Sequence, residues 1–226
     1  TVGQVWYNTT DNVLRYKNIS SAGAWSTSGN LNTGRNSGGM FGIQTASLCF
    51  GGAVSFTTAQ DIVESYNGSS WTEVGDMNEA KDFICGAGTT SAGLVFGGFL
   101  QPTNMNIAKD KHSGAGTQTS ALAFAGEDPG GLSGKTESWN GSGWTEVGDQ
   151  NTARTTASEA GSSNTSALVF MGDNVGNGTV SQLCESWNGS AWTEVGDTNT
   201  GGRLGAGCGT STEAMAMGRY SPSPGN

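Results

Sequence analysis

The chain has 226 residues, of which 38 are glycine and only 13% are charged, and its formal net charge is −9. This composition lacks the excess of basic residues that binding to nucleic-acid backbones requires, so nucleic acid is not an expected partner. No apolar run approaches the roughly 18 residues of a membrane span, so membrane insertion is not expected either. Such a glycine-rich, weakly charged chain is typical of a turn-rich β protein.

Two recurring strings define an internal repeat. The first reads ESYNGSSWTEVGD from Glu64, ESWNGSGWTEVGD from Glu137 and ESWNGSAWTEVGD from Glu185. The second closes on a short apolar run, and its copies end 46, 28, 46 and 47 residues apart. The residues at these ends are Phe50, Phe96, Phe124, Phe170 and Met217. A period of this length indicates supersecondary units that pack against their neighbours, and one unit has lost about 18 residues.

Each full unit is expected to contain about four antiparallel strands. Short apolar runs such as SALAF are followed by glycines, as strands that end in turns are. Asn-Gly pairs at Asn67, Asn140 and Asn188 lie between an aromatic residue and a tryptophan. Asn-Gly favours a two-residue type I′ hairpin turn, because both residues tolerate positive φ. No amphipathic helical stripe of useful length accompanies these strands.

The repeat divides the chain into units that form a single domain. In chain order they are residues 5–30 together with 198–218, then 31–76, 77–104, 105–149 and 150–197, with a tail at 219–226. The unit 77–104 is the shortened one. Residues 5–30 hold the back half of a unit and 198–218 the front half, so we expect them to share one unit and close a ring without exposed strand edges.

The units resemble the kelch repeat. Its pattern of double glycine, spaced Tyr and Trp, and closing basic residue is matched by Gly51-Gly52, Tyr66, Trp71 and the segment 78–81. The aromatic and basic parts recur as Trp139, Trp144 and Arg154, and as Trp187, Trp192 and Arg203. This resemblance implies an all-β fold, a β-propeller of about five kelch-like four-stranded blades with one blade shortened. The N- and C-terminal strands would share a blade.

A second resemblance rests on QVWYNTTDNVLRYK at residues 4–17 and on the strings NTAR and GAGTQTSALAFAG. These are similar to strings in repeat-containing virion proteins of tailed bacteriophages, especially phages of marine cyanobacteria. The resemblance implies a non-enzymatic tail-fibre or capsid decoration protein at the virion surface, and thus extracellular. Its partners would be a host cell-surface glycan or other virion proteins, and a homo-oligomer is compatible with this role. The alternatives are a cellular or secreted kelch-type interaction module and a glycan-active propeller enzyme.

Five basic residues follow the turn that opens each unit and are the candidate binding residues. They are Arg35, Lys81, Lys109, Arg154 and Arg203. Propeller symmetry would arrange them as a ring at one mouth of the central channel, where they could attract a polyanion or an acidic glycan. The alternative is a structural role, in which each basic side chain satisfies backbone carbonyls and carboxylates of its own surroundings.

The residues that carry catalysis and metal binding are sparse, so no enzyme activity and no cofactor are expected. His112 is the single histidine and is expected at a strand edge, which excludes a two-histidine metal site. The acids Glu73, Glu146 and Glu194 recur with the repeat, as turn caps or ion-pair partners do. The cysteines follow no metal-ligand spacing and are expected to be free core residues, with Cys184 and Cys208 the one pair that could bridge. They are Cys49, Cys85, Cys184 and Cys208.

Two further expectations concern single features. Asp173, Asn174 and Asn177 form an oxygen-rich loop that could hold Ca²⁺, although a plain turn is favoured because the spacing does not match an EF-hand. The tryptophans that follow the Asn-Gly turns are expected to be buried between neighbouring units.

Overall fold

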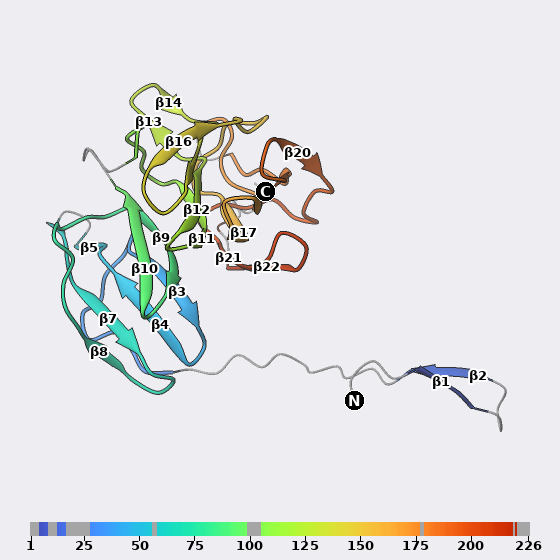
Figure 1. Cartoon of the computed structure of the whole chain (residues 1–226), viewed down its shortest axis with the longest axis horizontal. Helices are drawn as coiled ribbons and strands as arrows, with labels where there is room; N and C mark the ends of the chain where they lie inside the picture. Colours follow the sequence, from blue (N-terminus) through green and yellow to red (C-terminus); the bar gives the residue numbers. More distant parts are fainter. Residues whose placement is uncertain are drawn as a thin grey trace, which may run out of the picture.

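The computed structural model describes residues 5–8, 13–16, 28–55, 58–98, 105–176, 179–218 and 220. These residues form strands, turns and loops and contain no helix, which confirms the all-β prediction. This part of the chain accordingly holds no helix with the length and hydropathy needed to cross a membrane. Figure 1 shows the strands grouped into several antiparallel sheets that follow one another along the sequence.

Three units each form a four-stranded antiparallel sheet whose strands pair in chain order, as the repeat predicts. Unit 31–76 contains β3 (Gly39–Ile43), β4 (Ala46–Phe50), β7 (Val63–Tyr66) and β8 (Trp71–Glu73). Unit 105–149 contains β11 (Ser113–Thr117), β12 (Ser120–Phe124), β15 (Thr136–Trp139) and β16 (Trp144–Val147). Unit 150–197 contains β17 (Ser158–Ser163), β18 (Ser166–Phe170), β19 (Cys184–Trp187) and β20 (Trp192–Val195).

Two other units contribute one strand pair each within the described residues. They are β9 (Ile84–Thr89) with β10 (Ala92–Gly97), and β21 (Ala206–Gly209) with β22 (Ala214–Met217). Two-residue ribbons follow the second strand in two full units, as β5 (Ala53–Val54) with β6 (Thr58–Ala59) and β13 (Glu127–Asp128) with β14 (Gly131–Leu132). The shortened unit therefore keeps the first two strands of the repeat.

The Asn-Gly turns differ from the predicted two-residue type. In the hairpin of β7 and β8, Tyr66 pairs with Trp71, so the loop contains four residues. Gly68 has φ of +97°, while Asn67 does not have positive φ. The side-chain oxygen of Asn67 instead accepts the backbone N–H of Ser69 and of Ser70, both at 3.0 Å. The same arrangement recurs at Asn140 and Asn188, so asparagine is used for its side-chain acceptor rather than for left-handed backbone.

The first strands of successive units lie side by side in the order β3, β9, β11, β17, β21. Just before each of them stands a non-glycine residue with φ between 47° and 56°. These residues are Ser37, Phe83, Lys111, Thr156 and Leu204. Backbone hydrogen bonds join several of them from unit to unit: Phe83 donates to the Ser37 carbonyl at 2.8 Å, Thr156 to Lys111 at 3.2 Å and Leu204 to Thr156 at 3.0 Å. The first strands thus form one row in chain order that joins the successive units.

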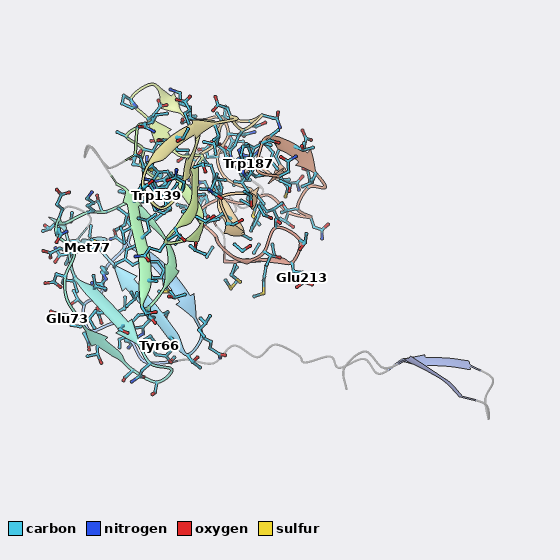
Figure 2. All side chains as sticks on the ribbon, viewed as in Figure 1. Tyr66, Glu73, Met77, Trp139, Trp187 and Glu213 are labelled. Atoms are coloured by element: carbon cyan, nitrogen blue, oxygen red, sulfur yellow. The ribbon has the colours of Figure 1, made fainter. Side chains whose placement is uncertain are left out.

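The aromatic residues of the repeat pack between units. Trp144 packs against Phe96 of the preceding unit with tilted rings whose centroids are 5.1 Å apart, and Trp192 packs edge-to-face against Phe124 at 5.0 Å. Both tryptophans are buried, as predicted, whereas Trp71 in the first full unit is only half-buried. Figure 2 shows Trp187 among densely packed side chains and Glu73 at the periphery. Burying an aromatic side chain stabilises a fold by several kcal/mol, so these contacts hold neighbouring units together.

The predicted sharing of one unit by the two ends of the chain involves residues that the structure describes only in part. β1 (Val5–Asn8) and β2 (Val13–Tyr16) pair with each other, and Figure 1 shows this hairpin apart from the other sheets. β21 and β22 likewise pair only with each other among the described strands. Trp25 and its neighbours at 17–27 lie outside the described residues. Closure of the ring by residues 5–30 stays a prediction.

Candidate functional site

Two of the five candidate basic residues form buried ion pairs within their own units. The Arg35 guanidinium lies 3.2 Å from Glu64 Oε1 and donates to the carbonyls of Ile62 and Cys49, both at 3.3 Å. Arg154 repeats the arrangement in unit 150–197, where its Nη2 lies 2.5 Å from Glu185 Oε1. Their charges are therefore neutralised inside the protein, and an external anion would have to compete with a buried carboxylate.

In units 77–104 and 105–149 a lysine takes the position that Arg35 and Arg154 have in the other two. Lys109 is buried and its Nζ donates to the backbone carbonyl of Lys135. Burial lowers the pKa of Lys109 to about 8, although nearby carboxylates, Glu137 first among them, oppose the shift. Lys81 is more exposed and lies 3.3 Å from Glu79. The four positions are equivalent, but the structure directs each side chain at groups of its own unit, and binding of a shared polyanion stays a prediction.

Arg203 is displaced by one residue from the position that the sequence alignment gave it. In three other units a glycine N–H donates to the carbonyl of the basic residue: Gly126 to Arg154 and Gly52 to Lys81 at 2.8 Å, and Gly98 to Lys109 at 3.2 Å. In the last unit the equivalent bond runs from Gly172 to Gly202, also at 2.8 Å. Gly202 therefore occupies the basic position. Arg203 stands one residue later and stacks on the Tyr220 ring at 4.9 Å.

Three buried glutamates at the start of the ES(Y/W)NGS string, Glu64, Glu137 and Glu185, hold the full units together. Each lies on the third strand and accepts two successive backbone N–H groups from the leading segment, the residues that precede the first strand of the unit. Glu137 accepts Asn106 N–H at 2.8 Å and Ile107 N–H at 3.0 Å. Glu64 and Glu185 do the same with residues 32–33 and 151–152. The asparagine side chain also donates to the fourth strand, at the carbonyl of Trp71, Trp144 or Trp192.

Other acids follow the repeat more visibly in the sequence. Glu73, Glu146 and Glu194 are exposed, and the buried glutamates were not considered as a group. The sequence could have pointed to them, because each full unit has this glutamate together with an asparagine and a basic residue near its start. A carboxylate that accepts backbone N–H groups and pairs with a buried cation is a structural element.

A cavity of about 370 Å³ is lined by residues of all five units, most of them directly before the first strand of each unit. Each unit contributes its positive-φ residue or the residues directly after it. Lys111, His112 and Glu159 bring the ionisable groups. Lys111 lies 2.7 Å from Glu127, which neutralises its charge. The cavity thus has one partly neutralised cation, one imidazole and one carboxylate.

His112 directly precedes β11 and is buried rather than at an exposed strand edge. Its ring packs on Phe96 with centroids 5.7 Å apart, and against Gly97, where a Cβ would lie 1.8 Å from the imidazole. Neither ring nitrogen makes a hydrogen bond of normal geometry to a described residue. Burial, with the charge of Lys109 adding, lowers the pKa of His112 to about 3. The imidazole is therefore neutral across the physiological pH range.

Glu159 on β17 is an acid that breaks the repeat, and the sequence analysis missed it. Counting from the positive-φ residue, the same position is Gly86, Gly114 or Gly207 in three other units. Burial raises the pKa of the Glu159 carboxyl to about 7, and a hydrogen bond from Ser113 opposes part of that rise. Burial and the charge of Glu159 together raise the pKa of the Cys85 thiol. A glutamate at a position where three other units have glycine was the feature of the sequence that could have identified it.

Asp173 and the cysteines were the remaining candidates for metal binding and for a disulfide. No group of three His, Cys, Asp or Glu side chains among the described residues could hold a metal ion. Asp173 Oδ1 accepts the N–H groups of Val175 and Gly176, at 3.0 and 2.8 Å, as in a turn; Asn177 lies outside the described residues. The four cysteines are free, and Cys208 is exposed rather than a core residue. The bridge considered between Cys184 and Cys208 is not formed.

Comparison with known proteins gives no relative: no family model matches the chain, and no curated protein matches it.

Proposed function

We propose that the chain is a five-bladed, kelch-like β-propeller that serves as a non-enzymatic structural or adhesion protein of a virion. It would bind a host-surface glycan or a neighbouring virion protein. The observation that carries the proposal is the use of the repeated polar residues. The buried glutamates and their basic partners hold each unit to its own leading segment, so the repeat encodes a scaffold, and recognition is left to the parts that differ between units.

Two features support the propeller. The first strands of five units lie side by side, and residues from all five line one cavity. The last unit has Gly202 where Arg35 and Arg154 stand in the others. In β2, Leu14 stands where the buried glutamate stands in β7, if Tyr16 is aligned with Tyr66. Both members of the ion pair are thus replaced together, as a unit shared by residues 5–30 and 198–218 would require.

A glycan-active enzyme is the second candidate, because a carboxyl with a pKa raised to about 7 is typical of a general acid. Glycoside hydrolysis usually needs two carboxyl groups that flank the bond. Glu159 is the single carboxylate among the described residues that line the cavity. The geometry therefore favours binding over turnover.

The test uses purified protein on an array of bacterial capsular polysaccharides and lipopolysaccharides, followed by size-exclusion chromatography of each bound polysaccharide after incubation. We expect binding without a change in polymer length. Shortened polymers would support the enzyme and contradict the proposal. Absence of binding across the array would contradict glycan adhesion and leave attachment to a neighbouring virion protein, which the next assay addresses separately.

A further inference from the structure

The shortened unit lacks a partner strand that every full unit has. The outer edge of the second strand pairs with a third strand in three units: β4 with β7, β12 with β15 and β18 with β19. β10 is the second strand of the shortened unit, and within the described residues it pairs only with β9. Residues 93–95 of β10 correspond to 121–123 of β12, which bond to β15. An unpaired strand edge is a template for strand addition.

The leading segment of the shortened unit is also without its carboxylate. In unit 105–149, Glu137 accepts the N–H groups of Asn106 and Ile107 beside Lys109. Asn78, Glu79 and Lys81 hold these places in the shortened unit, and no third-strand glutamate reaches them from the described residues. The Lys81 side chain is 18% exposed and its partner Glu79 is 65% exposed. This cation is therefore held by a solvated ion pair, which an incoming carboxylate can replace.

The third strand of two full units makes one more contact, from an aromatic N–H to the turn between the first two strands, and the shortened unit has an equivalent acceptor. The indole N–H of Trp139 donates to the carbonyl of Gln118, in the turn between β11 and β12, at 2.8 Å. Trp187 repeats this contact with Asn164 at 2.9 Å. Thr90 stands at the equivalent place in the turn between β9 and β10. The shortened unit thus offers a strand edge, a site for a carboxylate and an acceptor for an aromatic N–H in the spacing that the full units use.

We propose that the shortened unit binds an extended segment of a neighbouring protein by strand addition to β10. The segment carries a glutamate directed at residues 78–81 and, two positions later, a tryptophan or tyrosine directed at Thr90. This inference rests on the proposed function, because it supplies the place where a neighbouring virion protein attaches. The chain's own β2 is a poor occupant, since Leu14 stands where the glutamate would be needed.

The test uses a peptide of residues 135–149, which contains β15, labelled with fluorescein at its N-terminus and titrated with the full chain. We expect saturable binding in fluorescence anisotropy. A Glu137→Gln peptide should bind about tenfold more weakly, because hydrogen bonds to a charged acceptor are lost. Lys81→Gln in the protein should weaken binding similarly, and Glu79→Gln should strengthen it by removing the competing carboxylate. Lys111→Gln is the matched control and should leave the affinity unchanged.

The position of the peptide is checked by NMR, where amide shifts should concentrate at residues 78–81 and 93–95. Three results would overturn the proposal: no saturable binding, binding that ignores both Glu137→Gln and Lys81→Gln, or shifts confined to unit 105–149. Binding that appears only after removal of residues 1–27 would also overturn it, because the N-terminal segment would then be the occupant. The polysaccharide array tests glycan binding independently of this peptide assay. Failure of one assay therefore does not imply failure of the other.

Discussion

The complete unit 105–149 and the shortened unit 77–104, described at 77–98, share their first two strands and differ in the strands that follow. In both, two strands begin after a positive-φ residue, and Phe96 and Phe124 are equally buried beneath the tryptophan of the following unit. The complete unit adds β15 and β16, with Glu137 bonded to its own leading segment. The comparison shows that the inner strands and the fourth-strand tryptophan make contacts between units in both cases. The third strand stabilises its own unit through Glu137 and adds hydrogen bonds to the following unit, at the Thr136 hydroxyl and the Trp139 carbonyl.

The largest effect should come from removing a contact between units. Trp192→Ala should lower the free energy of unfolding by about 4 kcal/mol, because it leaves a cavity against Phe124 and an unpaired Thr136 hydroxyl. Trp71→Ala should cost clearly less, since Trp71 is half-buried. Guanidinium denaturation followed by tryptophan fluorescence and circular dichroism measures both. Equal losses would show that Trp71 is packed as tightly as Trp192, as ring closure by residues 5–30 would require.

A buried glutamate should come next. Glu185→Gln leaves the buried Arg154 charge without its partner and should cost about 3 kcal/mol. Glu194→Gln on the next strand is the matched control, and it should change stability by less than about 0.5 kcal/mol because that side chain is exposed. Urea denaturation of both variants measures the two changes in the free energy of unfolding. A Glu185→Gln variant as stable as its control would contradict the assigned structural role.

A smaller, pH-dependent effect is expected at Glu159. Its pKa in the folded state is raised to about 7, so its stabilising contribution is complete below its unfolded value near pH 4.5 and is lost as the pH rises through 7. Glu159→Gln should therefore gain stability relative to the wild type between pH 4.5 and 7, by on the order of 2 kcal/mol once partial exposure is allowed for. Ser113 bonds to the Glu159 carboxyl, the Cys85 thiol is close enough to be affected by its charge, and His112 and Lys111 line the same cavity.

Thermal unfolding at closely spaced pH values measures this difference. His112 contributes the opposite slope, because its pKa is lowered to about 3 and its stabilisation is lost as the pH falls below its unfolded value near 6.5. The two terms partly cancel in the wild type between pH 4.5 and 6.5. The Glu159→Gln variant should therefore lose stability more steeply on acidification, and a pH-independent difference would refute the assignment.

The smallest effect should be at Lys81. Lys81→Gln removes a solvated ion pair and should cost less than about 1 kcal/mol, whereas Arg154→Gln leaves Glu185 buried without its cation and should cost several kcal/mol. Chemical denaturation of the two variants compares the incomplete and complete units directly. A large loss at Lys81 would indicate that it is paired with a carboxylate other than Glu79.

The period of the sequence was sufficient to predict the four-stranded antiparallel sheets and the loss of strands in the shortened unit, because repeated apolar runs and turns are local signals. The partner of a side chain is not local. Glu185 bonds to residues more than 30 positions earlier, so its burial could not be read from its neighbours. Arg203 was assigned to a basic position that Gly202 occupies, because it is the nearest basic residue although it lies four residues after Asn199, where the other units place the basic residue three after the asparagine. The turn at Asn67 was misjudged because Asn-Gly fits two kinds of loop.

The positive-φ residues before the first strands have one more consequence. Ser, Phe, Lys, Thr and Leu occupy five equivalent places with nearly the same φ and all face one cavity. Left-handed backbone is unfavourable for every one of these side chains, so the surrounding hydrogen bonds, and not the residue type, impose it. Backbone geometry and side-chain identity are therefore decoupled there. The five side chains of the cavity wall can therefore change independently during evolution while the backbone around them stays the same.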